Sequence, residues 1–269
     1  FFEATISRSV TFILAQCAYF RSAGNGSIIV AMYDIQALRH TEFPHSHEVT
    51  YLNHAGIAPL PQRAKRDIQA AVEALSGDPS EYFGKTAFPA LIPLQPGLAR
   101  FFNAASLSAI SASASTSAAL NAVAQAIVWQ PGDRVLFCDA EFPSNAYPWL
   151  SLARDGVESC VVPADGGGLT LRAVEQHADA RTRVVAASAV QFFTGHRTEL
   201  AAIGRFCRER GILFVVDAIQ CIGHMPFDVQ SMNIDVLATG GQKALLGLPG
   251  GGVMDGGNDV GETRRPGLI

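Results

Sequence analysis

Apolar runs alternate with amphipathic stretches along most of the chain. The runs predict strands buried on both faces, at 135–138, 159–162, 183–190, 212–216, 236–239 and 251–254. Apolar residues spaced three or four apart predict helices at 63–75, 117–129, 147–154, 171–177 and 200–210. Proline and glycine predict a loop at 77–96. The alternation is typical of βαβ units and predicts an α/β fold, with a mostly parallel sheet and helices on both faces.

The pattern also divides the chain. A large α/β domain is expected at 61–254, after an N-terminal segment at 32–60 and before an irregular tail at 255–269 that has no periodicity. Residues 1–31 are expected to be a leader or upstream sequence outside the fold. Met32 begins a stretch that resembles a natural protein start, and the apolar run after Arg8 is too short to span a bilayer.

Composition narrows the class of function. With 269 residues, of which 48% are hydrophobic and 16% charged, the chain can bury one substantial α/β core. With a net charge of −4 and no Lys/Arg cluster, the sequence does not predict a positively charged surface that would bind nucleic acid or an anionic membrane. We therefore expect a small-molecule substrate. The five scattered cysteines show no metal-ligand spacing, which predicts buried thiols in the reducing cytoplasm and no metal site.

Two residues suggest a particular chemistry. Asp217 follows the apolar run 212–216, at the end of a predicted strand, where ligands bind in open α/β sheets. Lys243 follows the strand 236–239 through a glycine pair. A lysine amine can hold an aldehyde cofactor as a Schiff base, and a carboxylate can keep a pyridine nitrogen protonated, so the pair predicts a pyridoxal 5'-phosphate site. For an isolated pair, a helix-capping Asp and a solvated Lys would be the commoner explanation.

Six ordered sequence blocks strengthen the cofactor interpretation. They are YLNHAG (51–56), STSAALNAVAQAI (115–127), WQPGDRV (129–135), EFPSNAYPWL (141–150), VVDAIQCIGHMPFDV (215–229) and GGQKALLGLPGGG (240–252). Their order and spacing resemble the class V aminotransferases, a branch of the fold-type I pyridoxal phosphate enzymes that includes cysteine desulfurases, kynureninases and isopenicillin epimerase-like proteins. The resemblance implies the large domain of that fold, in a chain truncated so that the small C-terminal domain is largely missing.

The resemblance also implies roles for individual residues. Lys243 would form the Schiff base with pyridoxal phosphate, and Asp217 would pair with the pyridine nitrogen. Gln220 would donate a hydrogen bond to the phenolic oxygen of the cofactor. Phe142, in EFPSN, would stack on the cofactor ring, although ordinary core packing is its alternative role.

The phosphate is expected at the start of the helix 117–129. Ser115, Thr116 and Ser117 precede its apolar face, and a helix N-terminus offers unpaired N–H groups and a positive dipole end. The family block carries these hydroxyl residues at its phosphate site, whereas an ordinary Ser/Thr cap is the alternative. The family also carries an acidic residue near Ala118, which this chain lacks.

Three further positions follow from the resemblance. Gln191 occupies the place of an Asn or Gln that reaches the cofactor oxygen or the substrate carboxylate. Gln242 precedes the lysine where desulfurases have His, so it is assigned to the cofactor site but argues against a desulfurase. His54 borders the substrate in relatives, and a structural role is equally compatible with a lone histidine. Neither Arg264 nor Arg265 lies in a carboxylate-binding motif.

The sequence therefore predicts a pyridoxal phosphate-dependent enzyme that acts on an amino acid by transamination or related lyase or epimerase chemistry. Lys243 would move the α-proton, and the full-length form would be a homodimer. The first alternative is a catalytically inactive truncated fragment that keeps only the cofactor-domain fold. The second is a nucleotide-binding domain, suggested by the glycines at 166–168 and by GLPGGG at 247–252. The first cluster is typical of a turn before a helix, and the second lacks the Lys-Ser/Thr ending of a phosphate loop.

Overall fold

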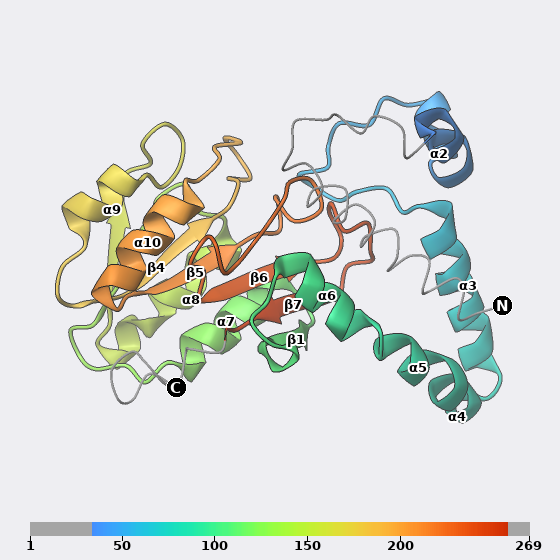
Figure 1. Ribbon diagram of the computed structural model, residues 1–269, viewed down its shortest axis with the longest axis horizontal. Coiled ribbons are helices and arrows are strands. Elements are labelled where there is room, and N and C mark those ends of the chain that lie inside the picture. Colours follow the sequence, from blue (N-terminus) through green and yellow to red (C-terminus); the bar gives the residue numbers. More distant parts are fainter. Residues whose placement is uncertain (1–33, 258–269) are drawn as a thin grey trace.

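A seven-stranded sheet between two layers of helices forms the body of the protein (Figure 1). The computed structural model describes residues 34–257. The predicted leader at 1–31 and the two arginines of the tail lie outside the described residues.

The sheet has the order β1-β7-β6-β5-β4-β2-β3. Pairing is parallel among β2 (Arg134–Cys138), β3 (Glu158–Val162), β4 (Thr182–Ser188), β5 (Leu213–Asp217) and β6 (Val236–Gly240). β7 (Gly252–Asp255) runs antiparallel to both of its neighbours, β6 and β1 (Ile110–Ser113). The predicted mostly parallel sheet is therefore confirmed. The edge strand β1 was not predicted, because its short ISAS sequence has no apolar run.

Each face of the sheet is covered by helices, as predicted. Along β5 the side chains alternate between faces, as in any strand. Leu213 and Val215 belong to the hydrophobic cluster that contains Leu120 of α7 (Thr116–Ala126). Phe214 and Val216 belong to the opposite cluster, with α6 (Leu94–Phe102), α9 (Leu171–His177) and α10 (Leu200–Arg210). The predicted helix at 147–154 is divided into α8 (Tyr147–Leu150) and the 3₁₀ helix η6 (Ser151–Asp155).

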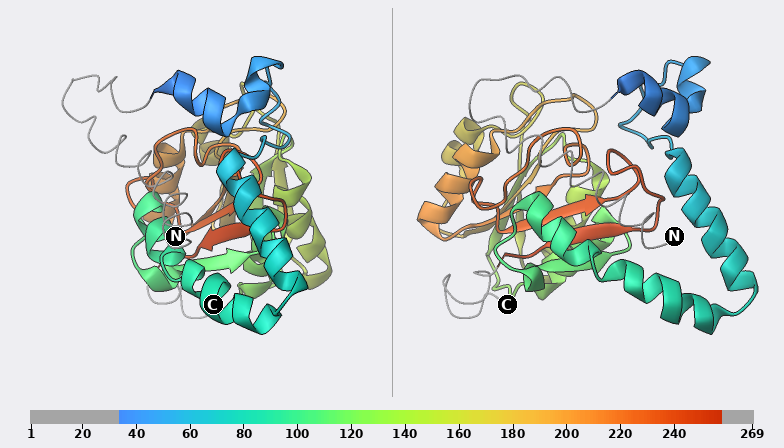
Figure 2. Two further views of the ribbon diagram at one scale, coloured as in Figure 1. Left: turned by 90° about the vertical axis from the view of Figure 1, so that its right-hand side faces the viewer. Right: turned by 45° about the vertical axis from the view of Figure 1, so that its right-hand side comes forward.

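The N-terminal part of the described chain is helical. It contains α2 (Ile35–Glu42), the 3₁₀ helix η2 (Pro44–His47) and α3 (Gln62–Ser76). A short α4 (Pro79–Tyr82), the π-helical η3 (Phe83–Ala87) and α5 (Phe88–Leu91) follow. Figures 1 and 2 show α3, α4 and α5 extending away from the sheet as an arm.

The predicted loop at 77–96 is wrong, because most of it is helical. Asp78 caps α4 by accepting hydrogen bonds from the backbone N–H groups of Ser80 and Glu81. Pro79 occupies the first turn of α4, where a missing N–H leaves no helical hydrogen bond unmade. The prolines that suggested a loop therefore stand at helix starts, and a second one occupies the first turn of α5.

Gly204 of α10 provides a test of the packing between that helix and the following loops. A Cβ atom at Gly204 would overlap the carbonyl oxygen of Met232. Alanine is favoured over glycine within helices by about 1 kcal/mol, but overpacking against fixed backbone costs about 1–3 kcal/mol. We expect Gly204→Ala to lower the free energy of unfolding by about 1 kcal/mol or more in urea titrations.

Gly84→Ala is the matched control, because a Cβ at this helical position would meet no described atom within 4 Å. It should leave the free energy of unfolding unchanged or raise it slightly. Equal or greater stability of Gly204→Ala relative to Gly84→Ala would contradict the close approach of α10 to Met232.

Candidate functional site

The carboxyl ends of the parallel strands gather residues from distant parts of the chain at one edge of the sheet. Residues 141–145 follow β2, Gln191 follows β4, and Asp217 is the last residue of β5. Lys243 follows β6. Because β7 is antiparallel, its first residue, Gly252, pairs with Gly240 at this same edge. The edge is where open α/β sheets bind ligands.

Asp217 is a buried carboxylate with two neutral hydrogen-bond donors. The Ile219 N–H lies 3.0 Å from Oδ1, and the Ser144 hydroxyl lies 3.2 Å from Oδ2. Burial raises the pKa of Asp217 to about 6, and the charge of Glu141 acts in the same direction. The two hydrogen bonds and the charge of Lys243 oppose this rise. Asp217 is therefore mainly ionised at neutral pH, although its ionised form is disfavoured relative to an exposed aspartate.

Lys243 lies beside two aromatic rings at the same edge. Its Nζ atom is 5.2 Å from the ring centroid of Phe192 and 5.9 Å from that of Phe142. The two rings form an edge-to-face pair with centroids 5.1 Å apart. Burial lowers the pKa of Lys243, while the carboxylate of Asp217 acts to raise it. Each of the two charges thus lies close enough to shift the pKa of the other, so the structure brings Lys243, Asp217 and Phe142 together.

A second buried carboxylate, Glu141, organises the neighbouring turn. Its oxygens accept hydrogen bonds from the N–H and hydroxyl groups of Ser188, at 2.9 and 2.6 Å. The side-chain amides of Gln191 and Asn145 add bonds of 2.7 and 2.9 Å. Burial raises the pKa of Glu141 against these four bonds. The Gln191 amide nitrogen thus donates to Glu141, whereas the Oε1 atom of Gln191 is buried without a hydrogen-bond partner among the described residues.

The N-terminus of α7 meets the same edge through a close contact. A Cβ at Gly252 would lie 2.7 Å from the carbonyl oxygen of Thr239 and 3.4 Å from Cα of Ser115, so only glycine fits there. Ser115 caps the helix, because its hydroxyl accepts from the Ala118 N–H at 3.0 Å. Thr116 follows as the first helical residue, and its hydroxyl is buried without a partner within the described chain.

The next residue of α7, Ser117, is exposed, and its carbonyl oxygen accepts from the side chain of Asn121. Ser115 therefore has the ordinary helix-capping role that was the alternative to phosphate binding for these hydroxyl residues. Capping leaves the Thr116 hydroxyl and the positive end of the helix dipole available to an anion.

The N-terminal segment reaches the site loops through backbone contacts. The Gln220 amide donates to the carbonyl oxygen of Ala55 at 3.1 Å, and the Ala58 N–H donates to that of Gln242 at 3.0 Å. The His54 ring lies 5.2 Å from Tyr51 and 6.2 Å from His224, between ring centroids. Gln220, Gln242 and His54 thus lie where the N-terminal segment joins the turns after β5 and β6.

Sequence analysis missed several residues of this site, which are Glu141, Ser144, Asn145, Ser188 and Phe192. The available signal was the EFPSN block, which follows a predicted strand and therefore lies at the ligand-binding edge. Within this block, the family resemblance implies a role for Phe142 alone.

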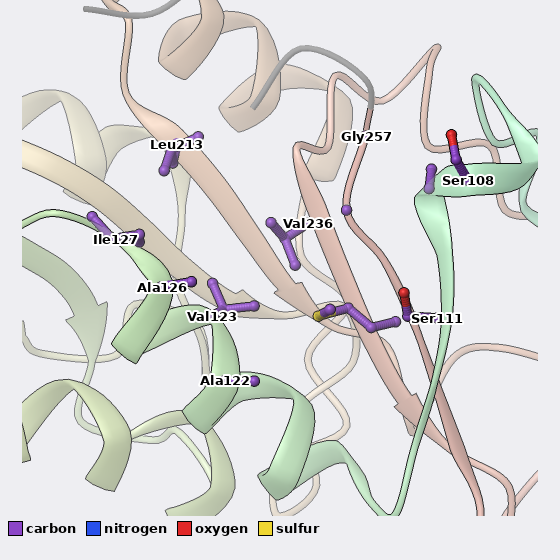
Figure 3. A pocket seen from close by; sticks show the side chains of 12 residues that line it. Ser108, Ser111, Ala122, Val123, Ala126, Ile127, Leu213, Val236 and Gly257 are labelled. Carbon is purple, nitrogen blue, oxygen red and sulfur yellow. The ribbon is translucent and has the colours of Figure 1, made fainter. Parts of the chain in front are cut away.

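A separate cavity of about 470 Å³ lies at the opposite edge of the sheet (Figure 3). Leu213 and Val236, the first residues of β5 and β6, line it together with apolar residues of α7. Ser108 and Ser111 are the polar side chains among its described lining residues. The cavity is therefore separate from the site of Asp217 and Lys243.

The glycines at 166–168 lie in a turn closed by pairing of Asp165 with Gly168. Their carbonyl oxygens bind the chain itself, since Thr194 donates to Gly167 and the His196 ring contacts Gly166. This turn packs on the loop after β4 and gives no support to a nucleotide site. Among residues 34–257, no helix is long and apolar enough to cross a membrane, and no group of three metal-ligating side chains was found.

The raised pKa of Asp217 makes a prediction about the chain without cofactor. When a carboxyl has a higher pKa in the folded chain than in the unfolded chain, the folded chain loses stability as the pH rises through the pKa of the folded state. Asp217→Asn removes this loss, so we expect it to raise the free energy of unfolding by about 3 kcal/mol at pH 8. The difference from the parent chain should shrink towards pH 4 in urea titrations.

Asp165→Asn is the control, since a hydrogen bond from Arg172 holds the pKa of Asp165 below its usual value. That substitution should not stabilise the chain at pH 8. A cofactor-free Asp217→Asn variant less stable than the parent at pH 8 would show that burial does not disfavour the charged carboxyl.

Comparison with known proteins identifies the family. Residues 50–269 match the family model Aminotransferase class-V. The chain is 37% identical to a probable cysteine desulfurase of Methanothermobacter thermautotrophicus over 61% of its own length and 41% of that protein. It is 33% identical to the uncharacterized aminotransferase YcbU of Bacillus subtilis over 51% of its length and 36% of that protein.

Solved structures share the fold. The cysteine desulfurase CsdA of Escherichia coli aligns with a TM-score of 0.71 and 26% identity, over 84% of this chain and 58% of that one. A mutant of C-DES with glycine covalently linked to its PLP cofactor aligns with a TM-score of 0.76 and 23% identity, over 88% and 67%. The chain spans less than half the length of the curated relatives it matches. The family model nevertheless covers most of the chain, and the protein belongs to the class V aminotransferase family.

Proposed function

We propose that this protein is a pyridoxal 5'-phosphate-dependent enzyme that acts on an amino acid, with Lys243 as the residue that binds the cofactor covalently. The observation that carries the proposal is the meeting of Lys243 and the buried Asp217 at the carboxyl edge of the sheet, each shifting the pKa of the other. Pyridoxal phosphate is also the cofactor named for the structurally similar C-DES.

The groups at this edge suit the chemical parts of the cofactor. Asp217 would pair with the pyridine nitrogen, because its carboxylate is mainly ionised at neutral pH and its two hydrogen-bond donors are neutral, which leaves its charge available to a cation. Thr116 would donate its unpaired hydroxyl to the phosphate at the N-terminus of α7, with Ser115 and Ser117 beside it. Phe142 would stack on the ring, since its side chain is 42% exposed at the site and is not enclosed in the core.

When bound, pyridoxal phosphate supplies an electron-withdrawing ring that stabilises negative charge at the substrate α-carbon. Asp217 would keep the ring nitrogen protonated by holding a negative charge beside it. The lowered pKa of Lys243 increases the neutral fraction of its amine, which is the form that attacks an aldehyde. Nζ of Lys243 would accept the α-proton of the amino acid and return it as a general acid.

The remaining predicted residues would complete the pocket. Gln191 would offer its buried, unpaired Oε1 atom to a donor on the cofactor or substrate. Gln220 and Gln242 would contact the cofactor from the turns after β5 and β6. His54 would border the substrate, because the segment that carries it is hydrogen-bonded to both turns.

The reaction is proposed to be a transamination or a related lyase or epimerase reaction. The named relatives include cysteine desulfurases and uncharacterized aminotransferases. We further propose a homodimer for the full-length form and a cytoplasmic location. The four described cysteines are free thiols, which supports a reducing compartment.

A second candidate is an inactive fragment that keeps the cofactor-domain fold. Such a fragment could still capture the cofactor at Lys243 but would not convert amino acids. Separate measurements of cofactor capture and turnover therefore distinguish the two candidates.

The cofactor-binding lysine can be identified directly, because the chain contains three lysines, Lys65, Lys85 and Lys243. We expect the purified chain to develop the visible absorbance of lysine-bound pyridoxal phosphate, and borohydride reduction should place the adduct on Lys243 in peptide mass spectra. Lys243→Ala should abolish both signals, whereas Lys65→Ala and Lys85→Ala should retain them. An unchanged band in Lys243→Ala, or an adduct on another lysine, would refute the assignment.

A further inference from the structure

We propose that Ser144 is a positioning residue for Asp217, whose hydroxyl fixes the carboxylate in the orientation needed to meet the ring nitrogen of the cofactor. This inference rests on the proposed function and adds a residue outside the motif assignments made from the sequence. Three features of the structure support it. They are the hydrogen bond on each oxygen of the Asp217 carboxylate, the anchoring of the turn that carries Ser144, and the charges around Asp217.

The carboxylate of Asp217 is held from two different turns. The Ile219 N–H binds Oδ1 from the turn that directly follows β5. The Ser144 hydroxyl binds Oδ2 from the 3₁₀ turn η5 (Pro143–Asn145), which follows β2. With one donor on each oxygen, rotation about the Cβ–Cγ bond would break both hydrogen bonds. Each oxygen also keeps a lone pair for a third donor, such as a protonated ring nitrogen.

The turn that carries Ser144 is itself fixed to the sheet. Glu141, just before η5, binds Asn145 at the end of that turn and both polar groups of Ser188 on β4. Ser188 is the residue paired with Asp217 between β4 and β5. The Trp149 indole N–H adds a hydrogen bond of 3.2 Å to the Asn145 side chain. Because Glu141 and Ser144 are anchored to neighbouring strand ends, the position of the hydroxyl is set before any ligand arrives.

The charges around Asp217 explain why a neutral donor suits this position. Two ionisable groups act on Asp217, the carboxyl of Glu141 and the ammonium group of Lys243. A hydroxyl donor favours the ionised carboxylate without adding a positive charge that would compete with a cationic ring. Ser144 therefore offsets part of the burial penalty and leaves the charge of Asp217 available to the cofactor.

The same turn begins at Phe142, whose ring lies near Nζ of Lys243. One short segment thus carries both the aromatic side chain proposed to cover the cofactor and the hydroxyl that holds Asp217. Displacement of this segment would affect stacking and the carboxylate together. A single substitution at Ser144 separates the two effects, because it removes the hydroxyl and leaves Phe142 in place.

The test compares three serine variants of the full chain by titration with pyridoxal phosphate from about pH 5 to pH 9. Ser144→Ala should bind the cofactor roughly tenfold more weakly near neutral pH, since it loses a hydrogen bond to a charged group. Its loss of affinity on acidification should begin at a higher pH, because without the hydroxyl donor Asp217 becomes protonated at a higher pH. Ser144→Thr keeps a hydroxyl and should largely restore both the affinity and the pH profile.

Ser151→Ala is the matched control, because the Ser151 hydroxyl donates to the carbonyl oxygen of Pro148 in the same region and does not contact Asp217. It should leave the affinity and the pH profile unchanged. Urea unfolding of each cofactor-free variant provides a readout of stability that is independent of binding.

Two results would overturn the role of Ser144 while leaving the proposed function intact. The first is a Ser144→Ala variant with parental affinity and pH profile, and the second is weaker binding that accompanies lost stability without a shift in the profile. Failure of the proposed function has a different signature, since the parent chain would then show no band that depends on Lys243. In that case the inference falls together with the proposed function.

Discussion

A carboxylate buried at the end of a central strand is the constraint on which the rest of this structure depends. Asp217 closes β5, which lies between β4 and β6. Burial disfavours its charge, and the close donors that offset this are a backbone N–H and a serine hydroxyl, both neutral. Asp217 therefore carries a negative charge that no cation among its hydrogen-bonding partners neutralises, and this charge lowers the stability of the folded chain above the pKa of Asp217.

The network around Glu141 shows how two buried acids coexist at one edge. Glu141 accepts four hydrogen bonds from N–H and O–H groups and a longer one from the Cys138 thiol, whereas Asp217 receives one on each oxygen. The first carboxyl therefore serves the structure, because it ties the turn after β2 to β4. The second keeps free lone pairs, as the proposed pairing with the cofactor requires. The two carboxyl groups are chemically alike, and they differ in the number of hydrogen-bond donors around them.

Local patterns could predict the strands, the helices on both faces of the sheet, and the position of Asp217 and Lys243 at strand ends. Asp217 and Lys243 each follow an apolar run, so their location at a strand end can be read from the sequence alone. The helix 171–177 and the helix 200–210 coincide with α9 and α10. The helix predicted at 63–75 corresponds to α3 of the arm. Helices α4 and α5 were missed because prolines at helix starts resemble those of loops, and β1 was missed because its residues lack an apolar pattern.

The partners of Asp217 could not be predicted in the same way. Ser144 lies 73 residues before Asp217, in the turn after β2, and β4 separates β2 from β5 in the sheet. Such contacts depend on strand order, which local periodicity does not encode. Asp217 belongs to a strand, whereas Phe142, Ser144 and Phe192 belong to the connecting turns. A family built in this way can diverge in substrate by exchanging turns over an unchanged sheet, which suits a lineage that includes both desulfurases and aminotransferases.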